Sequence, residues 1–467
     1  MKRDRTAFLQ DWLHSKERKP LVIRGARQVG KTWLIRNLAQ VEQHRLIEMN
    51  FEKQPELKSL FSSNNPREIL LNIAASKGGA IDPLKTILFL DEIQAAPQLL
   101  EKLRWFQEDL PDIPVVAAGS LLDITLAKHT FSMPVGRISY MYLEPLSFEE
   151  FLDATGQQEL RVYLGKYDWQ LHIPEALHSQ LMKLVKEYLI VGGMPTAVVS
   201  WAKEKALETV SQIHIDLLST YRDDFSKYRG RLGLDRLDEV MLSIPRQLGK
   251  KFVYKEVSID TGSTSLKQAL ELLCSAKVCH KVVSTSANGL PLGAESDDRC
   301  FKVIMLDCGL CSASLGLSLH QLGSISEISF VNSGGMAEQF VGQQLRTIFP
   351  AYMSPVTYYW HRAKKGAEAE VDYIIQHQNQ VFPLEVKAGT TGTLKSLHQF
   401  MKEKKKEIAI RINSDLPRVG PIHVKDFSGA SIEYTLLSLP FYLLGQLHRL
   451  IQSPALPAKP RKYLTIA

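Results

Sequence analysis

The chain has 467 residues, of which 45% are hydrophobic and 23% charged, a composition typical of a folded globular protein and not of a disordered one. Its length exceeds the roughly 250–300 residues at which one hydrophobic core stops growing, so several domains are expected. Lys and Arg outnumber Asp and Glu by 57 to 50, giving a formal net charge of +7 that is compatible with DNA as a partner but does not demonstrate one.

The sequence shows no secretory or membrane segment. Residues 1–6 are charged and lead into a stretch without the apolar core of a signal peptide. The longest apolar run, residues 434–447, is interrupted by Pro440 and Gly445 and is shorter than the ~20 residues that a membrane span needs. We therefore expect a cytoplasmic protein with no membrane partner.

Residues 1–160 alternate short apolar runs with helical patterns, which favours an α/β domain with a parallel sheet wrapped by helices. The strands are expected at 21–24, 46–51, 86–90, 115–118 and 138–143. The helices are expected at 32–39, 67–76 and 97–109.

Residues 161–232 are predicted to form a helical lid on the first domain. Within them, residues 175–228 show a helical pattern with a break only at the Gly-Gly-Met-Pro turn of residues 192–195. Residues 233–330 show two helices followed by two strands at 281–284 and 301–306, an order that suggests a winged-helix domain.

Residues 331–452 begin with a helix at 336–349, and strands are expected at 357–360, 371–376 and 381–387. The order of helix, three strands and helix is that of an α/β nuclease core. The proline-rich and basic residues 453–467 are expected to form a loosely ordered tail.

One motif predicts a phosphate-binding loop. The pattern G-x-x-x-x-G-K-[ST] is matched in full, between an expected strand and an expected helix, by Gly25, Ala26, Arg27, Gln28, Val29, Gly30, Lys31 and Thr32. The glycines allow backbone N–H groups to curl around phosphates, and the helix N-terminus adds its positive dipole end. Lys31 would neutralise the β and γ oxygens of ATP, and the Thr32 hydroxyl would bind Mg²⁺.

A second motif supports the first. The apolar run 86–90 ends in Asp91 and Glu92. We expect Asp91 to hold the Mg²⁺ ion and Glu92 to orient or deprotonate the attacking water. A chance glycine turn and an ordinary strand end are the plain alternatives for the two motifs.

Two further residues are candidates near the bound phosphates. Ser120 follows the strand at 115–118 and would contact the γ-phosphate or the water, or would simply cap a helix. Arg137 precedes the strand at 138–143 and would sense phosphate charge, reach a neighbouring subunit, or form a surface ion pair.

These residues carry a family resemblance. The runs R-G-A-R-Q-V-G-K-T, L-F-L-D-E-I-Q, G-R-I-S-Y-M-Y-L-E-P-L-S-F-E-E-F, V-G-G-M-P, N-G-L-P-L-G-A and F-K-V-I-M-L-D-C-G-L resemble a prokaryotic family of AAA-type ATPases. Its members carry a C-terminal domain of unknown function with a restriction-endonuclease-like fold. The resemblance spans nearly the whole chain and implies an ATPase domain, a lid, a winged helix and a nuclease-like domain, with ring assembly as a possible homo-oligomer.

A second acidic site is expected in the last third. Asp372 lies on one strand, and Glu385 and Lys387 lie on one face of the next. They resemble the PD-(D/E)XK signature, in which two carboxylates hold a divalent metal and the lysine assists the water. Glu338, on the preceding helix, resembles the additional acid of Holliday-junction-resolvase-like members, although no proline precedes Asp372. A fold that no longer cuts is the alternative.

Two other groups of residues have plain alternatives. The lysine-rich run at 402–406 would neutralise DNA phosphates or form a solvated helix face. Cys308 and Cys311 form a lone C-x-x-C without the second pair of a zinc ribbon, which favours buried free thiols over a zinc site.

The sequence therefore predicts an ATP-hydrolysing protein that acts on or with DNA. A nucleotide-dependent switch with a silent nuclease fold and a protein partner is the alternative. A nucleotide-gated chaperone is a third and weaker reading.

Overall fold

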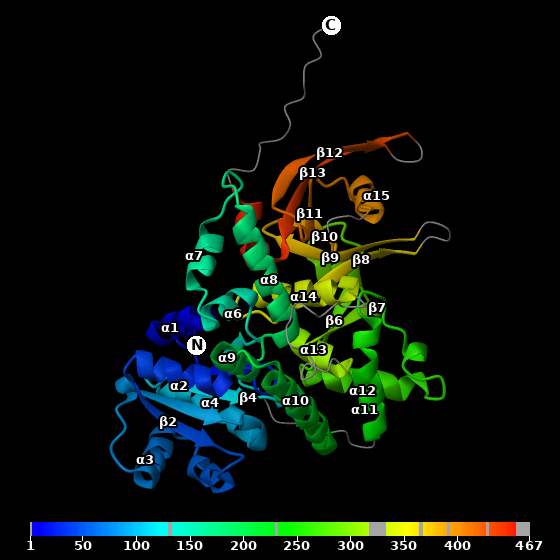
Figure 1. The fold of residues 1–467 in the computed structure, drawn as a ribbon. Helices are drawn as coiled ribbons and strands as arrows, with labels where there is room; N and C mark the ends of the chain where they lie inside the picture. The colour runs from blue at the N-terminus through cyan, green and yellow to red at the C-terminus, as the bar shows by residue number, and fades with distance from the viewer. Residues whose placement is uncertain are drawn as a thin grey trace.

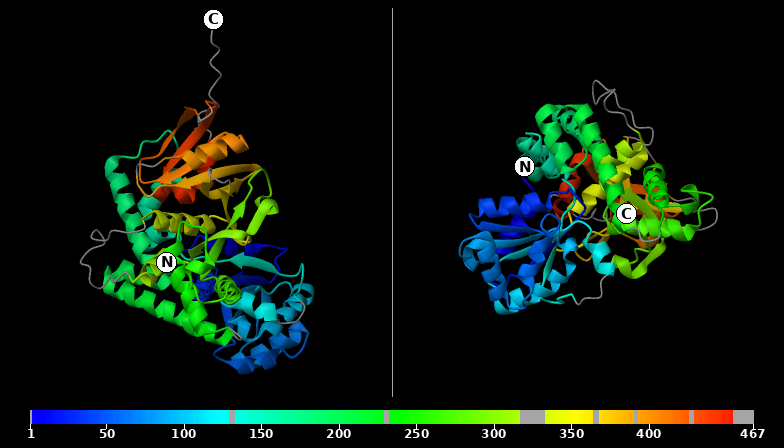
Figure 2. Two further views of the ribbon diagram at one scale, coloured as in Figure 1. Left: turned by 90° about the vertical axis from the view of Figure 1, so that its right-hand side faces the viewer. Right: turned by 90° about the horizontal axis from the view of Figure 1, so that it is seen from below.

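The computed structural model describes residues 2–128, 133–228, 232–316, 333–363, 368–389, 393–425 and 429–453. It contains two β-sheets, which lie toward opposite ends of the molecule with helices of the middle of the chain alongside them (Figures 1 and 2). Of the expected tail, residues 453–467, only Ser453 lies within the described part.

The first sheet consists of five parallel strands in the order β2-β3-β4-β1-β5. The strands are β1 (Leu21–Arg24), β2 (Arg45–Asn50), β3 (Thr86–Asp91), β4 (Val115–Gly119) and β5 (Ser139–Tyr142). β3 and β4 are buried along their whole length, as expected for central strands covered on both faces. The five strands expected from the sequence are present, with ends that differ by at most one residue.

Alternate residues of the central strands pack against different helical layers. Ile87 and Phe89 of β3 belong to a core with α1 and α2, whereas Leu88 and Leu90 belong to a core with α3 and α4. These helices are α1 (Arg5–His14), α2 (Lys31–Val41), α3 (Pro66–Lys77) and α4 (Leu103–Asp109). Short 3-10 helices lie at Pro55–Phe61, Pro83–Lys85, Ile93–Ala95 and Pro97–Lys102. The sheet is therefore sandwiched between helices on both faces.

Helices dominate the middle of the chain. They are α5 (Leu122–Lys128), α6 (Phe148–Ala154), α7 (Gln158–Lys166), α8 (Glu175–Val191), α9 (Pro195–Glu204), α10 (Leu207–Tyr228), α11 (Leu234–Ser243), α12 (Ser263–Ser275) and α13 (Cys308–Ser314). The expectation of a single break in the lid was wrong, because a second one follows α9, where Lys205 adopts a positive φ of 52°. Among the helices that the structure describes, none is long and apolar enough to cross a membrane.

The second sheet has eight strands in the order β12-β13-β11-β10-β9-β8-β6-β7. The strands are β6 (Cys279–Thr285), β7 (Ser296–Met305), β8 (Thr357–Arg362), β9 (Ala369–His377), β10 (Gln380–Val386), β11 (Ile408–Asn413), β12 (Arg418–Lys425) and β13 (Ser431–Pro440). The helices of this region are α14 (Ser333–Thr347), α15 (Lys395–Lys404) and α16 (Leu447–Ile451). Further 3-10 helices lie at Pro245–Gln247, Tyr254–Glu256, Leu292–Glu295 and Phe441–Gln446.

The hairpin expected to be the wing of a winged helix belongs to this second sheet. β6 and β7 pair antiparallel, and β6 also pairs parallel with β8, with Val282 opposite Thr357. The sheet therefore crosses the boundary expected between residues 330 and 331. The winged-helix and nuclease-like assignments stay predictions, but their strands share one sheet.

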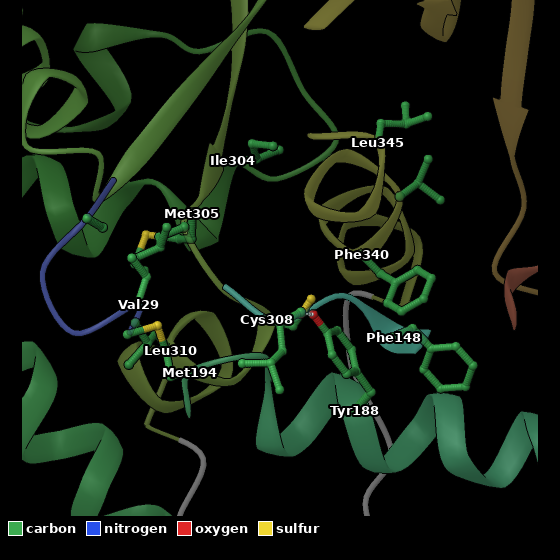
Figure 3. Close-up of a cluster of buried hydrophobic side chains, with 14 of the residues drawn as sticks. Val29, Phe148, Tyr188, Met194, Ile304, Met305, Cys308, Leu310, Phe340 and Leu345 are labelled. Atoms are coloured by element: carbon green, nitrogen blue, oxygen red, sulfur yellow. Dashed lines mark hydrogen bonds between the residues drawn. The ribbon is translucent and has the colours of Figure 1, made fainter. Parts of the chain in front are cut away.

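One hydrophobic core connects the two sheets. It contains Val29 of the predicted phosphate-binding loop together with Met194, Met305 and Leu310 from the middle of the chain (Figure 3). Phe340 of α14 lies in the same core. Because interiors are close-packed, a shift of the loop is felt by the helices that share this core.

A buried carboxylate holds the centre of this region together. Asp307 is 0% exposed, and its Oδ2 accepts a hydrogen bond from the backbone N–H of Gly193 at 2.5 Å. Its Oδ1 accepts from the N–H of Gly309 at 2.9 Å, and Gln343 Nε2 donates to Oδ2 at 3.0 Å. These bonds stabilise a charge that burial would otherwise disfavour, and they join the turn after α8 to α13 and α14.

We predict that Gly192→Ala destabilises the whole chain. Gly192 has a φ of 75°, and a Cβ atom there would lie 2.0 Å from Asp307 Oδ1. Backbone strain and the clash together are expected to lower the free energy of unfolding by about 2 kcal/mol or more, measured by urea denaturation. The control is Gly165→Ala on α7, where a Cβ would have no atom within 4 Å. Equal stability of the two variants would contradict the prediction.

Candidate functional site

Three loops meet at one edge of the first sheet. The loop 25–32 follows β1, Asp91 ends β3, and Ser120 follows β4. The strands run parallel, with Arg24 opposite Gly119 and Asp91 opposite Ala118. The carboxyl ends of neighbouring parallel strands are the usual place for a ligand in an α/β sheet. The structure therefore brings together the residues that the sequence selected for one site.

The loop 25–32 curls tightly around the start of α2. Gly30 has a φ of 97°, and a Cβ atom on Gly25 would lie 2.4 Å from the Leu143 carbonyl oxygen. Both positions thus require glycine. The Lys31 ammonium points back into the loop and donates to the carbonyls of Gly25 at 3.0 Å and Ala26 at 2.7 Å.

The charge of Lys31 is poorly compensated. Burial lowers the pKa of Lys31 to about 8, although the carboxylates of Glu92 and Asp91 act in the opposite direction. A bound anion would therefore strongly stabilise the charged form of the Lys31 side chain. A polyphosphate at the N-terminus of α2 has that charge.

Asp91 faces Thr32 across the site. The Thr32 hydroxyl donates to Asp91 at 3.1 Å to Oδ2 and 3.3 Å to Oδ1, and Asn50 Nδ2 donates to Oδ2 at 3.3 Å. Burial, followed by the charge of Glu92, raises the pKa of Asp91 to about 6. A hydroxyl and a carboxylate side by side are hard oxygen donors of the kind Mg²⁺ binds. Asn50 was not expected at this site from the sequence, although it ends β2 opposite Asp91.

Glu92 stands in an unusual backbone conformation, with a positive φ of 50°. Gln94 Nε2 donates to its carboxylate at 2.5 Å. Gln94 also packs on Gly119, where a Cβ atom would lie 2.4 Å from Gln94 Oε1. Gln94 thus positions Glu92, and the sequence analysis passed over it because a glutamine two residues beyond an acid is a weak signal.

Ser120 is buried, and its hydroxyl has no hydrogen-bond partner among the described residues. A buried hydroxyl without a partner costs free energy, so an oxygen-bearing ligand at this edge would satisfy it. The alternative role as a helix cap has no hydrogen bond to support it in the described part of the chain.

Distant residues clamp the loop in place. Arg3 is 3% exposed and donates to the Val29 carbonyl at 2.8 Å, to the Glu144 carbonyl at 2.7 Å and to Glu150 at 3.0 Å. On the other side, α10 holds Arg27. Asp224 pairs with the Arg27 guanidinium at 2.5 Å, and the Tyr221 hydroxyl donates to the Arg27 carbonyl at 2.9 Å.

Arg137 lies at the opposite edge of the sheet. It precedes β5, whose first residue Ser139 is opposite Leu21, whereas the loop follows the other end of β1. Its guanidinium is exposed and pairs with Glu108 at 2.8 Å. The expectation that it senses phosphate within its own chain is therefore wrong, and a role toward a neighbouring subunit stays a prediction.

The second acidic cluster is also assembled, but with a lysine at its centre. Lys302 of β7 has its Nζ 2.9 Å from Glu338 Oε2, 2.5 Å from Glu370 Oε1 and 3.5 Å from Asp372 Oδ1. Lys387 Nζ pairs with Glu385 Oε1 at 2.7 Å. Lys302 was not expected in this cluster from the sequence, since β7 is far from β9 and β10 along the chain.

Burial dominates the electrostatics of this cluster. Burial, and then the charge of Asp372, raises the pKa of Glu338 to about 7 and that of Glu385 to about 8. For Lys302 burial acts to lower the pKa, but the surrounding carboxylates outweigh it and the pKa lies well above its usual value. Lys302 is therefore an ammonium at neutral pH.

Across the described residues, no group of three or more His, Cys, Asp or Glu side chains is arranged to hold a metal ion. The metal role expected for Asp372 and Glu385 stays a prediction. Cys308 and Cys311 are both buried in α13, and burial raises the pKa of both thiols. Cys308 donates to Gln343 Oε1 at 3.0 Å, as a buried free thiol would.

Three family models match parts of the chain. Residues 17–152 match a model described as an AAA domain. Residues 182–321 and 333–417 match two models that are each described as a domain of unknown function. No curated protein matches the chain. Together with the loop geometry, the first match shows an AAA-type P-loop domain in the first third of the chain.

Several solved structures are similar at low identity. The ORC2 protein of Aeropyrum pernix, in ADPNP-ADP complexes, is 14% identical over 59% of this chain and 84% of that chain, with a TM-score of 0.33. The RuvB Holliday junction branch migration motor of Thermotoga maritima is 15% identical over 60% and 87%, with a TM-score of 0.27. The ORC1 protein of Aeropyrum pernix, in complex with DNA, is 12% identical over 66% and 89%, with a TM-score of 0.23. These overlaps are distant, and the assignment of the site rests on its own geometry.

We predict that Tyr221→Phe loosens the loop. The change keeps the buried ring but removes the hydrogen bond to the Arg27 carbonyl. The free energy of unfolding should fall by about 1 kcal/mol, because the carbonyl loses its partner. The matched control is Tyr352→Phe, since Tyr352 is 62% exposed. Urea denaturation of both variants gives the comparison, and an equal effect would contradict the prediction.

Proposed function

We propose that this chain binds ATP together with Mg²⁺ at the carboxyl edge of the first sheet and hydrolyses it. The observation that carries the proposal is the convergence of Lys31, Thr32 and Asp91, from a glycine-bounded loop and a neighbouring strand end. Each is the residue type that a triphosphate and its cation require at that place. The matching AAA domain over residues 17–152 supports the same conclusion.

The position of each residue in the site suggests its role in binding the phosphates or Mg²⁺. Backbone N–H groups of the loop and of the α2 N-terminus would bind the phosphates, and Lys31 would turn from the carbonyls of Gly25 and Ala26 to the β and γ oxygens. Thr32 and Asp91 would hold Mg²⁺, which supplies charge neutralisation between the β and γ phosphates. The contact of 3.1 Å between the Thr32 hydroxyl and Asp91 Oδ2 supports this assignment, because both oxygens lie within reach of one ion.

Hydrolysis needs a positioned water. Glu92 is held by Gln94 at the end of β3, and its carboxylate would accept the proton of the attacking water. The unpartnered hydroxyl of Ser120 would hydrogen-bond the γ-phosphate or that water. Asp224 and Tyr221 would couple the conformation of the loop to that of α10, because both lie on α10 and contact Arg27 inside the loop.

Two variants test the proposal. Lys31→Ala should abolish ATP binding in titration calorimetry, because the loop loses the charge that neutralises the phosphates. Glu92→Gln should keep ATP binding but lower kcat by about 10²- to 10⁴-fold, since only proton transfer is removed. The controls are Lys16→Ala and Glu17→Gln, two exposed residues of the same charges. Unchanged binding by Lys31→Ala would refute the site.

We further propose DNA as the partner, on the basis of the formal net charge of +7 and of the lysine-rich end of α15. Lys405 directly follows that helix as its C-cap residue and is exposed. A second candidate, a nucleotide-dependent switch with a protein partner, is favoured by the lysine that fills the acidic cluster. The two candidates differ in whether nucleic acid binds at all.

Fluorescence anisotropy with duplex and branched DNA separates them. Binding at low salt that weakens as salt is added, and that Lys405→Glu weakens more than Lys16→Glu, would support the DNA proposal. The salt dependence arises because basic side chains displace counterions from the phosphates. An absence of DNA binding at low salt would rule out the DNA proposal and favour the nucleotide-dependent switch.

A further inference from the structure

The acidic cluster of the second sheet contains a cation that the chain itself supplies. Lys302 is 3% exposed, and its side chain runs over the ring of Tyr359, whose centroid is 5.4 Å from Nζ. Of the three carboxylates around its ammonium, one comes from α14, which packs against β7, and two come from β9, which is not adjacent to β7 in the sheet order. The lysine therefore connects three elements that lie apart in the sequence.

Lys302 is held rigidly on both sides. One residue before it, the carbonyl of Phe301 accepts a hydrogen bond from the N–H of Phe252 at 2.9 Å. Three residues after it, the backbone of Met305 exchanges two hydrogen bonds with the side chain of Gln339, at 2.8 and 2.9 Å. Gln339 is the neighbour of Glu338 on α14. Its two hydrogen bonds therefore hold β7, which carries Lys302, against the helix that carries Glu338.

Two further carboxylate oxygens in and beside the cluster are engaged as well. Asp372 Oδ2 accepts the N–H of Val386 at 2.8 Å, while its Oδ1 faces Lys302. Glu385 Oε1 pairs with Lys387, and Glu385 Oε2 is buried without a partner among the described residues. A divalent ion would have to displace Lys302 to gain the three carboxylates that it needs.

We propose that the Lys302 ammonium takes the place of a divalent cation in this cluster, so that the folded chain binds no metal ion among Glu338, Glu370 and Asp372. The proposal goes beyond ATP binding and is independent of it. The cluster is then a buried ion-pair network that holds the β6–β7 hairpin against α14 and β9. Two opposite charges desolvated together are stable only while both are present.

Manganese binding tests the proposal in the full-length chain without nucleotide. Wild type and Asp372→Asn should bind the same number of Mn²⁺ ions in an electron paramagnetic resonance titration. Lys302→Met should bind one further ion, because the three carboxylates lose their ammonium. That further ion should disappear in Lys302→Met combined with Asp372→Asn. The control is Lys281→Met, a lysine on the adjacent strand that pairs with Glu271.

Two outcomes would overturn the proposal. A wild-type ion that is lost in Asp372→Asn would show that metal binds beside Lys302. A folded Lys302→Met that gains no ion would show that the lysine does not fill a cation site. Should Lys302→Met not fold, the comparison of wild type with Asp372→Asn still decides. ATP binding, measured on the same samples, reports separately on the first site.

Discussion

The parallel pairing of β1, β3 and β4 is the constraint on which the rest of the structure depends. It places the end of each strand at one edge, so that a loop, a carboxylate and a hydroxyl from three distant parts of the chain share a site. The parallel pairing of β5 with β1 likewise keeps Arg137 away from that edge, since Arg137 precedes β5 and lies at the opposite end of the strands. Strand direction alone thus decides which polar residues can act together.

The sequence predicted the parts of the site that local patterns define. The loop 25–32 has a spacing that is typical of phosphate binding, and Asp91 ends an apolar run that predicts a buried strand. Contacts made over long distances left no such trace. Arg3 contacts the loop from 26 residues away, and Asp224 contacts it from 197 residues away. A lone arginine or aspartate carries no pattern, so its role depends on the tertiary fold.

The same difference explains the second sheet. The order of helix and strands predicted a helix and three strands in residues 331–452, but it did not predict that β6 would pair with β8 and extend their sheet. That pairing delivers Lys302 to the carboxylates of Glu338, Glu370 and Asp372. The sequence signature therefore predicts which acidic residues lie together. Whether their charges are available to a metal also depends on β7, which brings Lys302 to them.

The shared sheet also governs how the molecule can be divided. A fragment that stopped at residue 330 would strip β8 from β6 and uncover the apolar surface that Phe340 and its neighbours now fill. Exposed strand edges next to bare hydrophobic surface promote aggregation. Truncations for crystallisation or expression should accordingly keep both halves.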